Sequence, residues 1–131
     1  RATVAFLSSI SSDIWPRFGV PASQIKRLKT ITLIGCGTSW HAARIAQYYF
    51  EMIAHIPTRV LLASEMRHMP YFPEEDALCI AISQSGETAD TLEAMRLAQH
   101  RGITTLALTN VASSTMVREA DGFLLTQAGQ E

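Results

Sequence analysis

The stretch that decides the fold is ALCIAISQSGETADTL, residues 77–92. Its first six residues are all apolar, which is typical of a buried strand, and its last residues have the pattern of a helix. Between them lies the turn SQSGET, residues 83–88. A strand, a tight turn and a helix in this order indicate one unit of a parallel α/β sheet.

The turn at 83–88 has the composition of a phosphate site. Ser83, Ser85 and Thr88 supply hydroxyl donors, and Gly86 allows the backbone to approach an anion closely. The helix that follows would add unpaired N–H groups and the positive end of its dipole. The alternative is that these hydroxyls only cap the helix. Three hydroxyls within six residues favour a ligand.

A second unit of this kind lies upstream, with the turn GCGTS at residues 35–39. Its Gly-x-Gly is a weak sign of dinucleotide binding, because Trp40 stands where a third glycine is expected. Thr38 and Ser39 can bond sugar hydroxyls or share the phosphate. We expect Cys36 to pack rather than react, since the sequence fixes no base near it.

Five short apolar stretches predict strands, and longer helical patterns separate them. The strands are expected at Thr30–Ile34, Thr58–Leu62, Ala77–Ile82, Thr104–Leu108 and Gly122–Leu125, with helices at Ser39–His55, at Thr88–Arg101 and from Ser113 or Ser114 through Ala120. This alternation predicts a three-layer α/β/α domain with a five-stranded parallel, flavodoxin-like sheet. The first and third strands are neighbours in that order, so both turns would face one crevice.

The helix expected at 39–55 has polar residues every three or four positions, which is the period of one helix face. These residues are His41, Arg44, Gln47, Glu51 and His55. We therefore expect a well-buried helix with one polar stripe. Its broad apolar face also indicates that another lobe or subunit covers some of the surface.

Composition excludes several classes of function. The 131 residues are 47% hydrophobic with a net charge of −1, which suits one domain and gives no reason to expect nucleic acid or an anionic membrane as partner. No apolar run is long enough to span a bilayer. The two cysteines lack disulfide or metal spacing, which indicates the cytoplasm, and the scattered histidines predict no metal site.

The two ends of the sequence carry further expectations. Residues 1–29 are irregular and are expected to be a lead-in segment packed on the domain, which would be 30–131 and truncated at its C-terminal end. Both lysines, Lys26 and Lys29, precede the first strand, so a lysine Schiff base from this chain is not expected. Glu87 and Glu131 are the nearest carboxylates for proton transfer, but neither is assigned as a catalytic base.

Taken together, Cys36–Ser39 and Ser83–Leu92 resemble the SIS (sugar isomerase) domain family, and within it the isomerase half of the glucosamine-6-phosphate synthases. The resemblance runs from Ile31 to Glu131 and includes Leu62–Glu65, Thr109–Asn110, Ser113–Ser114, Arg118–Glu119 and Ala128–Gly129. Trp40 departs from the usual tyrosine, which we expect to alter packing more than chemistry.

The resemblance implies the sugar-phosphate-binding lobe of an enzyme that makes glucosamine 6-phosphate from fructose 6-phosphate and glutamine-derived ammonia, with no metal or redox cofactor. By motif, the phosphate would be held by Ser83, Gln84, Ser85 and Thr88, and the sugar would be lined by Cys36, Gly37, Thr38 and Ser39. A second SIS lobe, a glutaminase domain and a second subunit in a homodimer would complete the enzyme. The chain alone would bind weakly and not turn over.

Other functions stay open at this point. Another SIS phosphosugar isomerase, or a deglycase, would share the hydroxyl turn. A non-catalytic SIS sensor would bind a sugar phosphate and regulate a partner such as a DNA-binding arm, although residues 1–29 show no convincing helix-turn-helix. In a purely structural lobe the hydroxyls would be caps only.

Overall fold

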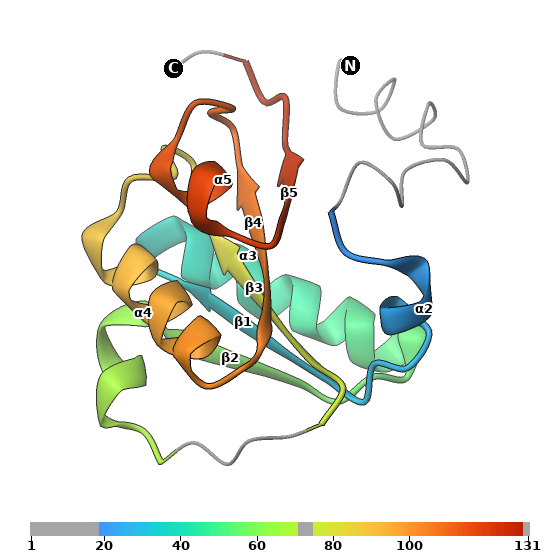
Figure 1. The fold of residues 1–131 in the computed structure, drawn as a ribbon. Helices are drawn as coiled ribbons and strands as arrows, with labels where there is room; N and C mark the ends of the chain where they lie inside the picture. Colours follow the sequence, from blue (N-terminus) through green and yellow to red (C-terminus); the bar gives the residue numbers. More distant parts are fainter. Residues whose placement is uncertain (1–18, 71–74, 130–131) are drawn as a thin grey trace.

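The computed structural model describes residues 19–70 and 75–129, so most of the lead-in segment and Glu131 lie outside the described residues. Within these ranges five parallel strands form one sheet (Figure 1). The strands are β1 (Thr30–Gly35), β2 (Thr58–Leu62), β3 (Ala77–Ile82), β4 (Thr104–Thr109) and β5 (Gly122–Leu125). All five predicted strands are confirmed, and β1 and β4 each extend one residue further than expected.

The strand order is β2-β1-β3-β4-β5, the flavodoxin-like order predicted from the sequence. β1 and β3 are neighbours, and their register pairs Gly35 with Ile82. The turns that follow these two strands therefore begin at the same level on the carboxyl edge of the sheet.

Helices lie on both faces of the sheet, as the three-layer prediction requires (Figure 1). One face carries α4 (Ala89–His100), the 3₁₀ helix η3 (Ala63–His68) and α5 (Thr115–Glu119). Met66, Met95 and Met116 of these helices are fully buried in one cluster with β3. The other face carries α3 (Gly37–Tyr49), and the short α2 (Ala22–Ile25) is tied to β4 because Gln24 Nε2 donates a hydrogen bond to Thr104 Oγ1.

The helix expected at 39–55 differs from its prediction. It begins earlier, at Gly37, and its α-helical hydrogen bonding changes at Phe50 to the π-helical η2 (Phe50–Ala54), which ends at His55 with φ 55°. Within α3, Ala43 is the one fully buried residue. The expectation of a well-buried helix is therefore wrong for the described residues.

Two residues of the expected polar stripe, half-buried Gln47 and exposed Glu51, also bond the protein. Gln47 Nε2 donates a hydrogen bond to Thr58 O at 2.7 Å, and Thr58 N donates one to Glu51 Oε1 at 3.2 Å. These side chains satisfy backbone groups at the start of β2, which is an edge strand. Apolar side chains of this helical segment are exposed as well, and five of them are 58% to 73% exposed: Ile45, Tyr48, Tyr49, Met52 and Ile53. We call these five the α3 apolar stripe.

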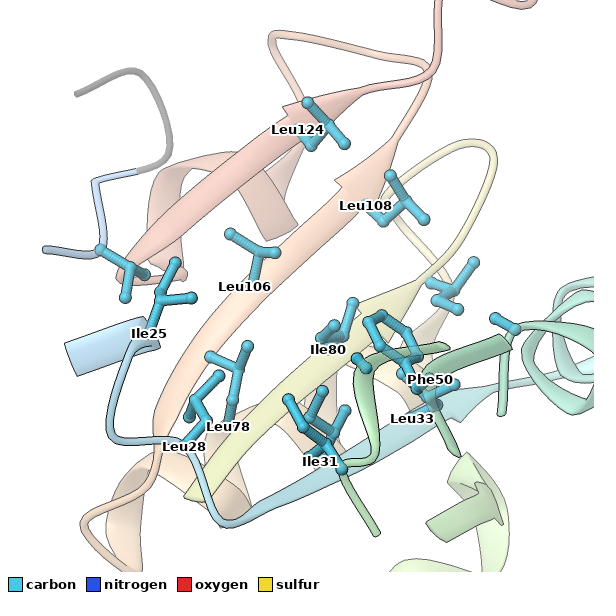
Figure 2. Close-up of a pocket in the computed structure, with 15 residues that line it drawn as sticks. Ile25, Leu28, Ile31, Leu33, Phe50, Leu78, Ile80, Leu106, Leu108 and Leu124 are labelled. Atoms are coloured by element: carbon cyan, nitrogen blue, oxygen red, sulfur yellow. The ribbon is translucent and has the colours of Figure 1, made fainter. Parts of the chain in front are cut away.

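An open apolar cavity of about 470 Å³ lies on the α3 face of the sheet. Figure 2 shows Leu78, Leu106 and Leu108 rising from β3 and β4, with Phe50 and Ile25 among the other lining residues. Within the described ranges, α3 and α2 thus leave part of this face open, whereas parallel sheets are ordinarily covered on both faces.

Candidate functional site

The loop between β3 and α4 closes on itself through its own hydroxyls. Ser83 Oγ and Thr88 Oγ1 share a hydrogen bond of 2.9 Å. Gly86 N donates to Ser83 Oγ at 3.1 Å, and Glu87 N donates to Ser85 Oγ at 3.2 Å. The chain therefore forms a compact turn in which backbone N–H groups and hydroxyls converge.

The hydroxyl of Thr88 does not cap α4. Thr88 is the N-cap residue of this 12-residue helix, yet its side chain makes no capping hydrogen bond. Gln84 and Ser85 are exposed at the start of the helix, whereas Ser83 is buried. This arrangement argues against the reading in which the hydroxyls are caps only, and it leaves N–H groups of the first helical turn without a side-chain cap.

Gly86 allows the loop to lie close against the segment between β4 and α5. Its φ is 67°, and a Cβ at this position would stand 2.3 Å from Ser114 Oγ and 2.9 Å from Thr109 Oγ1. Met116 N donates a hydrogen bond to Gly86 O at 3.1 Å. Both the left-handed backbone and the close approach require glycine here.

The turn after β1 lies on the neighbouring strand. Cys36 is the N-cap residue of α3 without a side-chain cap, and Ser39 N donates to Cys36 O at 3.1 Å. Cys36 and Ser39 are half-buried, whereas Gly37 and Thr38 are exposed. Thr91 Oγ1 of α4 donates a hydrogen bond of 3.9 Å to Cys36 Sγ. The adjacency of β1 and β3 thus brings both turns to one edge of the sheet, and this contact joins the first turn to α4.

The β4–α5 segment, residues 109–116, supports the loop, although the two hydroxyl turns predict no site residue there. Thr109 Oγ1 and Asn110 N both donate to Gln84 O at 3.0 Å. Ser114 is 1% exposed, and its Oγ has no hydrogen-bond partner among the described residues. The available signal was the polar run TNVASST at 109–115, directly after a strand.

Asn110 also holds the chain that leaves β5. Ala128 N and Thr126 Oγ1 donate to Asn110 Oδ1 at 2.8 Å and 3.1 Å, and Asn110 Nδ2 donates to Gly129 O at 2.6 Å. The segments that follow β3, β4 and β5 are therefore linked along the carboxyl edge, next to the turn that follows β1.

Three ionisable groups differ in what surrounds them. The backbone N–H of Thr115 bonds the Glu87 carboxylate and lowers the pKa of Glu87 below its ordinary value. Burial raises the pKa of the Cys79 thiol to about 12, so this cysteine packs rather than reacts. Lys29 lies just before β1, at the opposite edge, with its Nζ 3.3 Å from Asp76 Oδ2.

Two kinds of feature are absent from residues 19–70 and 75–129. No group of three His, Cys, Asp or Glu side chains there is arranged to hold a metal ion. Nor does any helix in these ranges combine the length and the apolar character needed to cross a membrane.

Comparison with known proteins finds a matching family model and similar proteins that share one name. The family model described as SIS domain matches residues 24–131. A glutamine–fructose-6-phosphate aminotransferase (isomerizing) of Symbiobacterium thermophilum is 46% identical over 86% of the chain, and one of Legionella pneumophila (strain Lens) is 48% identical over 87%. The chain spans 19% of the length of each.

The chain is also similar in three dimensions to a solved structure. The C-terminal domain of glucosamine-fructose-6-phosphate aminotransferase from Francisella tularensis superposes with a TM-score of 0.85 and 33% identity, covering 98% of this chain and 37% of the other.

Proposed function

Because the chain belongs to the SIS domain family, we propose that it is the sugar-phosphate-binding lobe of an isomerising glutamine–fructose-6-phosphate aminotransferase. The curated relatives at 46% and 48% identity carry that name, which favours this enzyme over another SIS isomerase, a deglycase or a sensor. The full reaction, which makes glucosamine 6-phosphate from fructose 6-phosphate and glutamine-derived ammonia, belongs to the longer protein.

The observation that carries the proposal is the loop between β3 and α4. Its hydroxyls and backbone N–H groups converge at the start of a helix whose N-cap side chain makes no capping bond. Hydroxyl donors, backbone donors and a helix N-terminus are the groups that bind phosphate without a metal ion. We assign the phosphate to Ser83, Gln84, Ser85 and Thr88.

The sugar is assigned to the turn that follows β1. Cys36, Gly37, Thr38 and Ser39 begin α3 on the strand next to β3, and the Thr91 hydroxyl bonds Cys36. A phosphate held at the end of β3 would leave the rest of a hexose to extend along the edge toward this turn. Polar Thr38 and Ser39 supply hydroxyls that can bond those of the sugar.

The chemistry of the reaction needs more chain than this lobe. Lys26 and Lys29 precede β1, so in the described residues no lysine stands at the carboxyl edge to form an imine. We therefore propose that a second SIS lobe and a glutaminase domain complete the enzyme, that the protein works in the cytoplasm as a homodimer, and that this lobe alone binds without turnover.

The α3 apolar stripe supports a larger assembly. Its five side chains are more than half exposed, although monomeric soluble proteins rarely leave such patches uncovered. We propose that the second SIS lobe covers this stripe. Replacing Ile53, the most exposed of them at 73%, by Glu is expected to leave the folding of this lobe unchanged and to weaken the contact between lobes in the longer protein.

A titration followed by backbone amide shifts tests the proposed ligand. Fructose 6-phosphate and glucosamine 6-phosphate are expected to shift residues 36–39 and 83–88, whereas unphosphorylated fructose shifts neither and inorganic phosphate shifts only the second group. The double variant Ser85→Ala, Thr88→Ala should abolish these shifts. Shifts that persist in that variant, or that fall elsewhere on the domain, would contradict the assignment.

A further inference from the structure

Glu87 lies inside the candidate phosphate loop, but its carboxylate is directed to another element. Glu87 Oε1 accepts a hydrogen bond of 2.7 Å from the backbone N–H of Thr115, the first residue of α5. This bond is the main reason for the lowered pKa of Glu87. The Thr115 side chain and the charge of Arg118 also lower this pKa, whereas desolvation and the charge of Glu119 raise it without outweighing them. Glu87 is therefore ionised at neutral pH and bonded to α5.

The direction of this carboxylate matters because the loop is proposed to bind an anion. A free carboxylate between Gly86 and Thr88 would repel a phosphate held by the neighbouring residues. A carboxylate bonded to an unpaired backbone N–H group has part of its charge offset. Arg118 adds to this effect, because its guanidinium is fixed beside α5 by hydrogen bonds to Ser113 O and to Thr115 Oγ1.

The same segment also holds the backbone of the loop. Thr109 Oγ1 donates to Gln84 O at 3.0 Å, and Met116 N donates to Gly86 O at 3.1 Å. These two contacts fix the first half of the loop. The contact of Glu87 fixes the next residue along, directly before Thr88, which is the N-cap of α4.

We propose that Glu87 is a positioning residue for phosphate binding: it fastens the loop to α5 and keeps its own charge away from the anion. In this role Glu87 does not touch the substrate. The role therefore differs from proton transfer, for which the sequence made Glu87 a candidate. The inference rests on the proposed function of the loop.

Two substitutions separate the contact from the charge. Glu87→Ala removes both, whereas Glu87→Gln keeps an oxygen that can accept the hydrogen bond from Thr115 N. Glu93→Ala is the matched control, because Glu93 is an exposed glutamate of α4 with its Oε2 3.6 Å from Arg67 Nη2. Each variant is compared with the unchanged chain in its affinity for fructose 6-phosphate and in amide exchange at Thr115 without ligand.

Loss of one hydrogen bond to a charged group should weaken binding of fructose 6-phosphate by about tenfold in Glu87→Ala. Glu87→Gln is expected to recover most of the affinity, and Glu93→Ala all of it. Thr115 N–H should exchange faster in Glu87→Ala alone.

Affinity for fructose 6-phosphate that is unchanged or tighter in Glu87→Ala would overturn the proposal, as would unchanged exchange at Thr115. If Glu87→Ala does not fold, Glu87→Asp replaces it. The shorter aspartate side chain keeps the negative charge but does not reach Thr115 N. We therefore expect Glu87→Asp to bind fructose 6-phosphate more weakly than Glu87→Gln. Failure of the unchanged chain to bind any sugar phosphate would contradict the proposed function itself. Protection of Thr115 N–H from exchange would still test separately whether Glu87 bonds Thr115.

Discussion

Replacing Gly86 by Ala tests how tightly the candidate phosphate loop is held against the β4–α5 segment. The left-handed backbone of Gly86, with φ 67°, would cost an alanine about 1 to 2 kcal/mol. Its Cβ would also stand 2.3 Å from Ser114 Oγ and 2.5 Å from Ser114 Cβ, and Ser114 is 1% exposed. Overpacking of this kind adds about 1 to 3 kcal/mol, so we expect the free energy of unfolding to fall by about 2 to 5 kcal/mol.

Gly102→Ala is the matched control, because Gly102 has φ 77° but nothing within 4 Å of its Cβ position. Denaturant unfolding of both variants separates backbone strain from the contact with Ser114. Adding Ser114→Gly to Gly86→Ala should recover the contact part of the loss. A loss in Gly86→Ala no larger than that in Gly102→Ala would refute the reasoning, because it would mean that the loop moves away from Ser114 at no cost.

Three further predictions concern single side chains. Ser83→Ala should lower the free energy of unfolding by about 1 to 3 kcal/mol, because it leaves the buried N–H of Gly86 without its acceptor; denaturant unfolding measures this, and no loss would contradict it. Since the folded-state pKa of Glu87 is lowered, its stabilising contribution is fully present above the ordinary glutamate pKa and is lost as the pH falls through the folded-state value. In acid unfolding experiments the stability of Glu87→Gln should therefore approach that of the unchanged chain at low pH. A difference in stability that stays constant as the pH falls would contradict this prediction. At pH 8 a thiol reagent should modify half-buried Cys36 but not buried Cys79, whose pKa is about 12, and mass spectrometry of the peptides would reveal any equal labelling.

Much of the fold could be predicted because its signals are local. Each strand is a short apolar run bounded by polar residues, and the alternation of strands and helices indicates a parallel sheet covered by helices. The helix at 39–55 shows where this reasoning fails. Its polar residues do repeat with the period of a helix face, but the helix is not well buried, because apolar side chains at other positions are exposed as well.

The candidate site likewise has one part that the sequence indicates and another that only the structure shows. Hydroxyls and a glycine after a strand mark the turn at 83–88 without any knowledge of the rest of the chain. The residues that hold this turn come from another part of the chain: Thr109 contacts Gln84, and Thr115 contacts Glu87, across separations of 25 and 28 residues. No local pattern indicates such pairs, because each depends on β3 and β4 lying side by side.

The sequence by itself determined the class of fold, the five strands and the two polar turns, because strand, helix and turn propensities act over a few neighbouring residues. Only the tertiary structure decided that Glu87 bonds α5, that Ser114 lies under Gly86, and that the α3 apolar stripe is exposed. Each of these depends on which segments meet in space. That is set by the packing of the whole sheet and not by the residues on either side.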